Sequence, residues 1–188
     1  MLGLHSLTGK FLIAMPGIGD PRFEKSVVLL CMHTRSAAMG VVLNKPRKAV
    51  TIGDVLGQLG VEIKRRVPSR PVLEGGPVKP DRGFVLHSED FAAGPSTQDV
   101  APGVRLTATR EVLDALGGAE APREYVLALG YAGWGPGQLE TELAHNVWLV
   151  GEAQKGIVYG ARHATKWADA IRDIGLDPIQ FSGETGRA

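Results

Sequence analysis

The chain has 188 residues, of which 44% are hydrophobic and 22% charged, and its formal net charge is +1 at pH 7. This composition is typical of a soluble globular protein with one domain over residues 1–188, and the charge argues against direct binding to DNA or to a membrane. The only cysteine, Cys31, excludes an internal disulfide. We expect a cytoplasmic location, because the broken apolar run at residues 11–19 fits neither a signal peptide nor a membrane span.

Three apolar runs near the start of the chain predict neighbouring strands. Residues 27–33 are continuously apolar, which indicates a strand buried on both faces, and residues 10–15 and 39–43 are similar. The connections between these runs are too short for helical crossovers. We therefore expect antiparallel pairing among the three strands.

The rest of the chain mixes predicted helices and strands without regular βαβ spacing. Further strands are expected at residues 72–74, 83–87, 104–109, 125–129, 147–150 and 156–160. Helices are expected at residues 51–59, 110–118, from Pro136 onward and at 161–174. The polar residues 89–102 predict a long surface loop. This order indicates an α+β fold with a mixed, mainly antiparallel sheet and about four helices.

Residue types at two predicted helix starts support these assignments. Thr51 with Asp54 three residues later forms a capping-box pattern, and Gly60 can end that helix. Thr109 can cap the helix that follows it.

The glycine-rich sequence GYAGWGPGQLETEL at residues 130–143 is the most distinctive stretch of the chain. It follows a predicted strand, and Pro136 can occupy the first turn of the next helix. On that helix Gln138, Glu142 and His145 share one face. Glu142 and His145 could bind a metal or share a proton, and a solvated helix face with a weak side-chain pair is the alternative.

No signature of catalysis or cofactor binding accompanies this stretch. The histidines show neither HxH nor HExxH spacing, no GxSxG or Cys/His signature marks a nucleophile, and we predict no metal site. The loops PGIGD, EGGPV and AGWGPG match no nucleotide-binding pattern, so tight turns are the simpler interpretation and no cofactor is expected. The basic residues 64–70 are interrupted by proline, which argues against a DNA recognition helix.

Five segments together resemble the AlgH/YqgE family in order and spacing. They are KFLIAMP, PRFEKSVVLLCMH, GVVLNKP, LEGGPVKPDRGFVLH and LGYAGWGPGQLETEL, and the similarity continues through NVWLV, the helix containing Trp167 and SGETGRA. The resemblance implies a bacterial protein with a compact α+β fold whose sheet forms a bifurcated pseudo-barrel. It implies no established activity, although some members are labelled transcriptional regulators.

The resemblance also marks a set of polar and glycine positions. They are Asn44, Pro46, Gly75, Gly76, Pro77, His87, Gly133, Trp134, Gln138, Glu140 and Glu142. We expect seven of them to converge on one surface pocket that binds a ligand: Asn44, Gly75, Gly76, His87, Trp134, Gln138 and Glu142. Strand ends beside glycine loops commonly present ligand groups. The alternative is that the glycine corners pack together and bury these side chains in a satisfied polar network.

Three functions are compatible with these observations. We favour a non-enzymatic regulator of gene expression that acts through a protein partner or a small ligand. The second is a small-molecule or nucleotide-binding enzyme that uses the glycine corners with Asn44, His87, Gln138 and Glu142. The third is direct DNA binding, which the near-neutral charge argues against.

Overall fold

The computed structural model describes residues 5–181, so the SGETGRA segment lies outside the described residues. Ten strands form one hydrogen-bonded sheet in the order β10-β1-β2-β3-β9-β6-β8-β7, and β4 and β5 branch from β9. The strands are β1 (Lys10–Ala14), β2 (Val27–His33), β3 (Ala38–Val42), β4 (Pro46–Thr51), β5 (Pro71–Glu74), β6 (Val78–His87), β7 (Thr97–Ala101), β8 (Val104–Thr107), β9 (Tyr125–Trp134) and β10 (Trp148–Glu152). The α-helices within this range are α1 (Ile52–Gln58), α2 (Arg110–Gly117), α3 (Gln138–Ala144), α4 (Lys155–Tyr159) and α5 (Lys166–Asp173).

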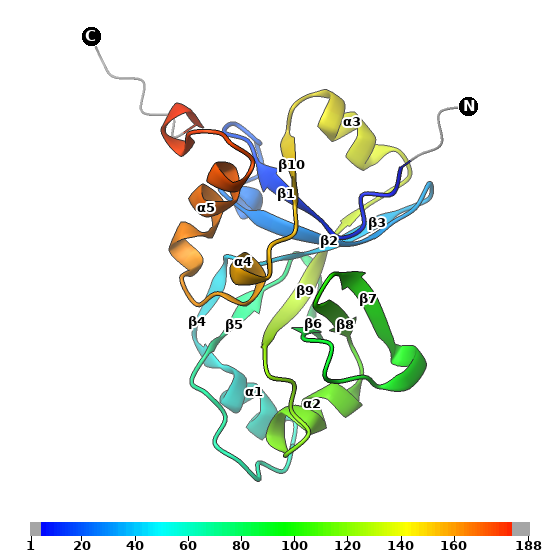
Figure 1. Cartoon of the computed structure of the whole chain (residues 1–188), viewed down its shortest axis with the longest axis vertical. Helices are drawn as coiled ribbons and strands as arrows, with labels where there is room; N and C mark the ends of the chain where they lie inside the picture. Colours follow the sequence, from blue (N-terminus) through cyan, green and yellow to red (C-terminus); the bar gives the residue numbers. More distant parts are fainter. Residues whose placement is uncertain (1–4, 182–188) are drawn as a thin grey trace.

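The sheet divides at β9, which runs between the upper and lower halves of the molecule (Figure 1). Residues 132–134 of β9 pair with β3, whereas residues 125–131 pair with β6 and, in parallel, with β5. Gly130 lies between these two parts with a φ of 74°, a backbone conformation that glycine adopts easily. The other strand pairs are antiparallel. The predicted mixed, mainly antiparallel, bifurcated sheet is confirmed.

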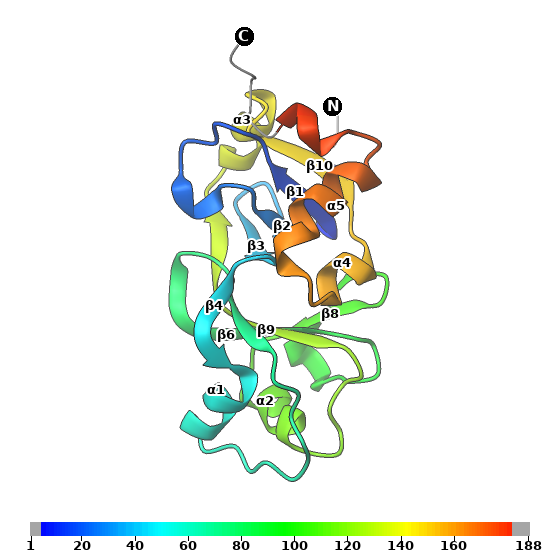
Figure 2. The same cartoon turned by 90° about the vertical axis from the view of Figure 1, so that its left-hand side faces the viewer.

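Helices cover both faces of the upper half of the sheet (Figure 2). Along β1, Leu12 packs in the same cluster as Leu139 of α3, while its neighbour Ile13 packs in the cluster that contains Ile171 of α5. This follows from the alternation of side chains across a strand. In the lower half, α1 and α2 pack together with β5, β6 and β9 in a third cluster.

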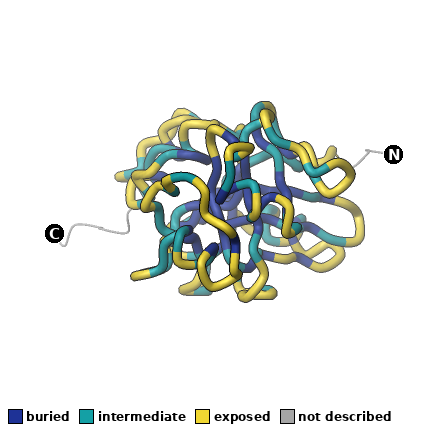
Figure 3. Tube along the Cα trace, turned by 90° about the horizontal axis from the view of Figure 1, so that it is seen from below, coloured by how far each residue is buried: buried dark blue, intermediate teal, exposed yellow. Residues whose placement is uncertain are grey.

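Buried segments gather in the interior of the molecule, and exposed loops surround them (Figure 3). The apolar runs predict a core at residues 27–32, 41–43, 85–86 and 126–129, and all of these residues are buried except Met32 and Leu129, which are partly exposed. Trp167 is 7% exposed and donates its indole N–H to the carbonyl oxygen of Ala14 at 2.9 Å. This side chain therefore fixes α5 against β1. No described helix is both long enough and apolar enough to cross a membrane.

Local helix signals are confirmed at α1 and only partly at α2. Thr51 and Asp54 form the predicted capping box, and Gly60 has a φ of 65° after the helix end. Thr109 is the N-cap residue of α2, but its side chain makes no capping hydrogen bond.

Two predictions about strands and loops are wrong. Residues 89–102 contain β7, which forms a hairpin with β8 through a turn in which Gly103 has a φ of 74°. The sequence shows no apolar pattern for β7, because this strand lies at the sheet edge and buries only Val100. Residues 156–160 were expected to form a strand but belong largely to α4, whose five residues are too few to show helical periodicity.

Two predicted helix boundaries also need correction. α3 begins at Gln138 and not at Pro136, because Gly137 is in the left-handed conformation with a φ of 70°. α5 spans only Lys166–Asp173, because residues before it form a 3-10 turn at His163–Thr165.

Candidate functional site

The carboxylate of Glu142 is the centre of a polar cluster on α3. Its Oε2 accepts the indole N–H of Trp134 at 2.8 Å and that of Trp148 at 2.7 Å. Its Oε1 accepts the side-chain amide of Gln138 at 2.9 Å. An ionised carboxylate only accepts hydrogen bonds, and these three groups all donate, so the cluster is matched in polarity.

The strand–corner–helix sequence brings these residues together. Trp134 ends β9, and the corner at residues 135–137 turns the chain into α3. The side-chain oxygen of Gln138 accepts the backbone N–H of Gly135 at 3.1 Å, which holds the corner against the first turn of the helix. Trp148 begins β10, and the two indole rings meet edge to face with centroids 6.0 Å apart.

A surface hollow of about 260 Å³ lies against this cluster. We call it the tryptophan pocket; Trp134, Gln138 and Glu142 line it together with Phe23, Pro77 and Trp148. Phe23 closes one side, because its ring meets that of Trp148 edge to face with centroids 5.9 Å apart. Three of the seven predicted site residues thus meet at one pocket.

Gly76 lines a second hollow of about 370 Å³ next to the tryptophan pocket. The two hollows share Arg22, Phe23 and Pro77 in their linings. Lys45 also lines the second hollow, and burial lowers the pKa of its ammonium group. A ligand larger than the first hollow therefore has space to continue past Phe23 and Pro77.

Charged side chains at the rim of the tryptophan pocket are already paired with each other. The guanidinium of Arg22 donates to both carboxylate oxygens of Asp20, the shortest contact being 2.7 Å. These hydrogen bonds lower the pKa of Asp20 and raise that of Arg22. The pair supports the loop that carries Phe23.

Asn44 and Gly75 lie in the backbone framework beside these hollows. The side-chain oxygen of Asn44 accepts the N–H of Val27 at 2.9 Å, and its amide donates to the carbonyl oxygen of Lys25 at 2.7 Å. A Cβ on Gly75 would lie 2.2 Å from the carbonyl oxygen of Gly130. Gly75 therefore packs backbone to backbone against Gly130 within β9, and not against the corner at residues 135–137.

The structure does not bring His87 to the tryptophan pocket. His87 is fully buried in the lower half, where its Nδ1–H donates to the carbonyl oxygen of Ser88 at 2.9 Å. Its Nε2 accepts the hydroxyl of Thr107 at 2.8 Å, and Thr107 is hydrogen-bonded to Thr97. Burial lowers the pKa of His87, so the ring is neutral and links β6, β8 and β7.

His145 and Cys31 take no part in the pocket either. The imidazole of His145 donates to the carbonyl oxygen of Thr141 at 2.7 Å. Cys31 is fully buried, and burial raises the pKa of its thiol to about 12. Within residues 5–181, no group of three or more His, Cys, Asp or Glu side chains could hold a metal ion.

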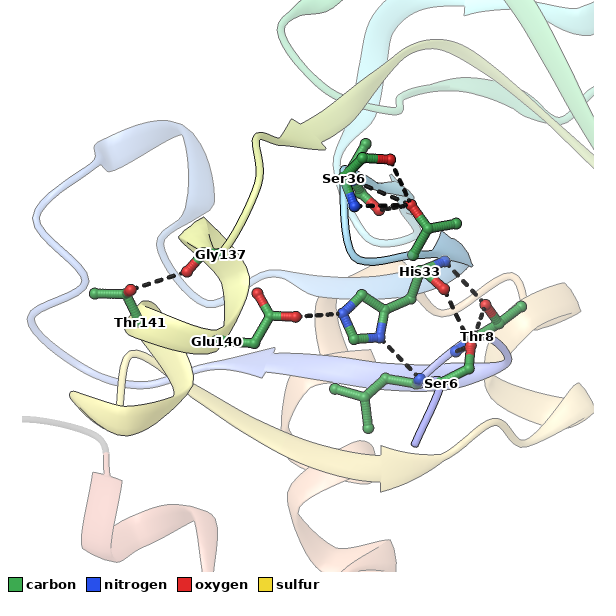
Figure 4. Close-up of polar contacts among 10 residues, drawn as sticks. Ser6, Thr8, His33, Ser36, Gly137, Glu140 and Thr141 are labelled. Atoms are coloured by element: carbon green, nitrogen blue, oxygen red, sulfur yellow. Dashed lines mark hydrogen bonds and ion pairs between the residues drawn. The ribbon is translucent and has the colours of Figure 1, made fainter. Parts of the chain in front are cut away.

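A second polar cluster, at His33, joins the N-terminal segment to α3 (Figure 4). The Nδ1 atom of His33 accepts the backbone N–H of Leu7 at 3.0 Å, so its Nε2 carries the proton and donates to Glu140 at 2.8 Å. The backbone N–H of His33 donates to the hydroxyl of Thr8 at 3.0 Å. The pKa of Glu140 is lowered by its own backbone N–H and by His33. This cluster has a clear role in holding the chain near residues 6–8.

Sequence reasoning missed Trp148, Phe23 and the Arg22–Asp20 pair as site residues. Trp148 carried a detectable signal, since an indole N–H at a strand start six residues after Glu142 needs an acceptor. Phe23 and Arg22 are distant from the helix in sequence, and only tertiary packing brings them to the pocket.

Comparisons with known proteins show the family of the chain. A family model described as AlgH-like matches residues 11–179. A UPF0301 protein of Caulobacter vibrioides is 50% identical over 183 residues, which cover 97% of this chain and 94% of that relative. A UPF0301 protein of Paracoccus denitrificans is 42% identical over 185 residues, 97% of each chain. The chain belongs to the AlgH-like family.

Solved structures support the same assignment. The solution structure of the AlgH protein from Pseudomonas aeruginosa has a TM-score of 0.76 and 33% identity, covering 100% of this chain and 99% of that one. A crystal structure from Corynebacterium diphtheriae has a TM-score of 0.69 at 21% identity, covering 88% of this chain and 85% of that one, and shows the fold alone. The names of these AlgH-like relatives state no reaction or ligand, so a function has to come from the residues of the pocket.

Proposed function

We propose that this AlgH-like protein is a non-enzymatic regulatory protein that binds a small organic ligand in the tryptophan pocket. The observation that carries the proposal is the meeting of Trp134, Gln138 and Glu142 at one surface hollow. Ligand sites are typically concave and mainly apolar, with a few fixed polar groups. The tryptophan pocket combines an apolar wall, made by the two tryptophans with Phe23 and Pro77, with the polar side chains of Gln138, Glu142 and the Arg22–Asp20 pair.

The hydrogen bonds of the pocket favour binding over proton transfer. Glu142 accepts three hydrogen bonds, which leaves about one of its four lone-pair positions free. Asp20 is engaged by Arg22. A general base has to reach and accept a proton of the substrate. We therefore assign Glu142 to fixing the two indoles as a wall, with one free position for a hydrogen-bond donor of the ligand.

Regulation would then act through the ligand or a protein partner and not through direct operator binding. The net charge of +1 gives little electrostatic attraction to phosphates. We also propose a cytoplasmic location, in keeping with the free thiol of Cys31. A gel-shift titration at near-physiological salt tests the DNA statement, and tight binding to one promoter fragment in the presence of competitor DNA would contradict it.

Native mass spectrometry of freshly purified protein tests the ligand proposal. We expect a bound small molecule on the wild-type chain and a reduced bound fraction on a Gln138→Ala variant. Gln180→Ala is the matched control, since Gln180 is also an exposed glutamine but does not line the pocket. A wild-type mass equal to that of the bare chain, or equal retention by Gln138→Ala, would count against the tryptophan pocket.

A further inference from the structure

β10 lies at one end of the sheet, where β1 is its strand partner among the described residues. The N–H of Met15 donates to the carbonyl oxygen of Val147 at 2.9 Å. This bond shows which residues of β10 are hydrogen-bonded to β1 and which are not. Antiparallel pairs alternate between bonded and non-bonded positions. The backbone groups of Trp148, Val150 and Glu152 therefore point away from β1, toward the open edge.

This edge lacks the features that normally prevent strand addition. Five consecutive pairs join β1 and β10 without a register shift, and the strand sequence WLVGE contains neither proline nor lysine. Its one charged side chain, Glu152, is paired with Lys10 of the same chain. Val150 is 39% exposed at the centre of the strand. Flat edges of this kind are ready to pair with another strand.

The other edges of the described sheet are protected. β7 has a register shift between Asp99 and Ala101 and follows a 3-10 helix that contains Pro95. β4 starts at Pro46 and has a register shift in its pairing with β5. Bulges, prolines and exposed charges are the usual means of blocking an edge. β10 therefore lacks the blocking features that both β7 and β4 have.

Space for another strand is present beside β10. A hollow of about 420 Å³ is lined by Val150, Gly151 and Glu152 and, from the end of α5, by Asp173 and Ile174. The Cγ2 atom of Ile174 lies over Gly151, where a Cβ would be only 2.8 Å away. The hollow thus offers an open backbone edge next to a mixed surface, in which Val150 and Ile174 are apolar and Lys10, Gln154 and Asp173 are polar.

We propose that β10 pairs with β10 of a second copy of this chain, antiparallel, about a two-fold axis at Val150. In this register the two Val150 residues are opposite each other, and each Trp148 is opposite a Glu152. Trp148, Val150 and Glu152, whose backbone groups point away from β1, are then the residues that form hydrogen-bonded pairs with the second copy. The pairing is isologous, which means that both copies use the same surface. A single contact therefore gives the β10 edge of each copy a partner strand.

The charges of the strand permit this register. The two Glu152 carboxylates are four residues apart along the paired strands, about 13 Å at roughly 3.3 Å per residue. That distance exceeds the Debye length of about 8 Å at physiological salt, so their repulsion is screened. No other charged side chain lies on the strand. Five paired residues form a small interface, so we expect a weak dimer that dissociates on dilution.

Sedimentation velocity of the full chain from about 1 μM to about 1 mM tests the association, since this range covers weak interfaces. We expect the mass to rise with concentration toward twice the 20.0 kDa of one chain. Val150→Lys places two ammonium groups opposite each other and should leave a monomer throughout. Leu59→Lys, a matched change at a residue 44% exposed in the lower half, should associate like the wild type.

Disulfide trapping tests the register. Bonded antiparallel pairs have Cα atoms about 5.5 Å apart, within the range of about 4.4–6.8 Å that a disulfide spans. A Val150→Cys variant should therefore give a covalent dimer under mild oxidation, and Leu59→Cys should not; Cys31 is buried and does not compete. A monomeric wild type at every concentration would overturn the proposal, as would a dimer that persists in Val150→Lys and is not trapped by Val150→Cys.

Discussion

Trp148 and Glu142 are joined by a hydrogen bond of 2.7 Å between the indole Nε1 and the carboxylate Oε2. The bond links the first residue of β10 to the last turn of α3 across a short connection. Trp148 is only 5% exposed, so its N–H has little access to water. The same oxygen serves Trp134, which is 6% exposed. One carboxylate therefore accepts hydrogen bonds from two buried indole N–H groups, one at the end of β9 and one at the start of β10. Loss of the carboxylate leaves both groups without this acceptor.

A Glu142→Leu variant should lose about 2–4 kcal/mol of unfolding free energy. Leucine has a similar length but no acceptor, and each buried unpaired donor costs about 1–3 kcal/mol. Glu142→Gln should lose less, because its amide oxygen can still accept from one indole. Urea unfolding followed by tryptophan fluorescence measures both. Glu120→Gln, at an exposed residue, is the control, and an equal loss in the control would contradict the role given to Glu142.

Asn44→Ala should be more destabilising than Gln138→Ala. Asn44 bonds the backbone of Lys25 and of Val27, the first residue of β2, so its truncation should cost more than about 2 kcal/mol. Gln138 is exposed at the pocket, and its truncation should cost less than about 1 kcal/mol. Thermal or urea unfolding compares the two. Equal losses would show that the pocket edge and the framework are not separable in this way.

Lys166 should make stability rise with pH between about 8 and 9. Burial lowers its pKa from 10.5 to about 8, so above pH 8 the unfolded chain binds more protons than the folded one. The gain should reach about 1 kcal/mol by pH 9. Above pH 9 the buried thiol of Cys31 acts in the opposite direction, because its pKa is raised from 9.0 to about 12.

Unfolding of Lys166→Met between pH 7 and pH 9 isolates this contribution. The variant should lack the rise, whereas Lys155→Met, at an exposed lysine, should retain it. Lys166 also donates to the carbonyl oxygens of Leu43 and Val158 at 3.1 and 3.2 Å, so the variant should be less stable than the wild type at pH 9. If the unfolding free energy of Lys166→Met rose with pH as steeply as that of the wild type, the rise would come from other groups.

Trp167→Ala should cost about 3–5 kcal/mol, the usual range for a buried tryptophan. The side chain belongs to the core cluster that contains Ile13 and Ile171, and its indole N–H donates to the carbonyl oxygen of Ala14. Leu176→Ala, at a residue 37% exposed just after α5, should cost less than about 1 kcal/mol. Thermal unfolding gives both values, and an unchanged melting temperature for Trp167→Ala would mean that α5 is not held by this contact.

Much of the fold could be predicted because its signals are local. β2 is continuously apolar over seven residues, and the α1 capping box is complete within four. β7 and α4 lacked such signals: one buries a single side chain at the sheet edge, and the other has only five residues. Their conformations depend on neighbours that are distant in sequence.

The candidate site also contains residues that local sequence places and residues that only tertiary packing places. Trp134, Gln138 and Glu142 lie within nine residues, and a strand, a corner and one helix turn are enough to place them together. His87 depends on the packing of β6, β7 and β8, which makes it a buried structural residue far from that corner. Phe23 comes from the opposite end of the chain and could be found only from the tertiary structure.

The position of β9 also determines when this protein can fold during synthesis. β3 and β6 both pair with β9, yet β9 ends at Trp134, far later in the chain than either. A nascent chain that stops before this point has two strand edges without their partner, and such edges promote association between chains. Closure of contacts so distant in sequence is slow. We therefore expect ribosome-bound chains shorter than about 134 residues to need protection, and folding to become cooperative only once β9 has emerged.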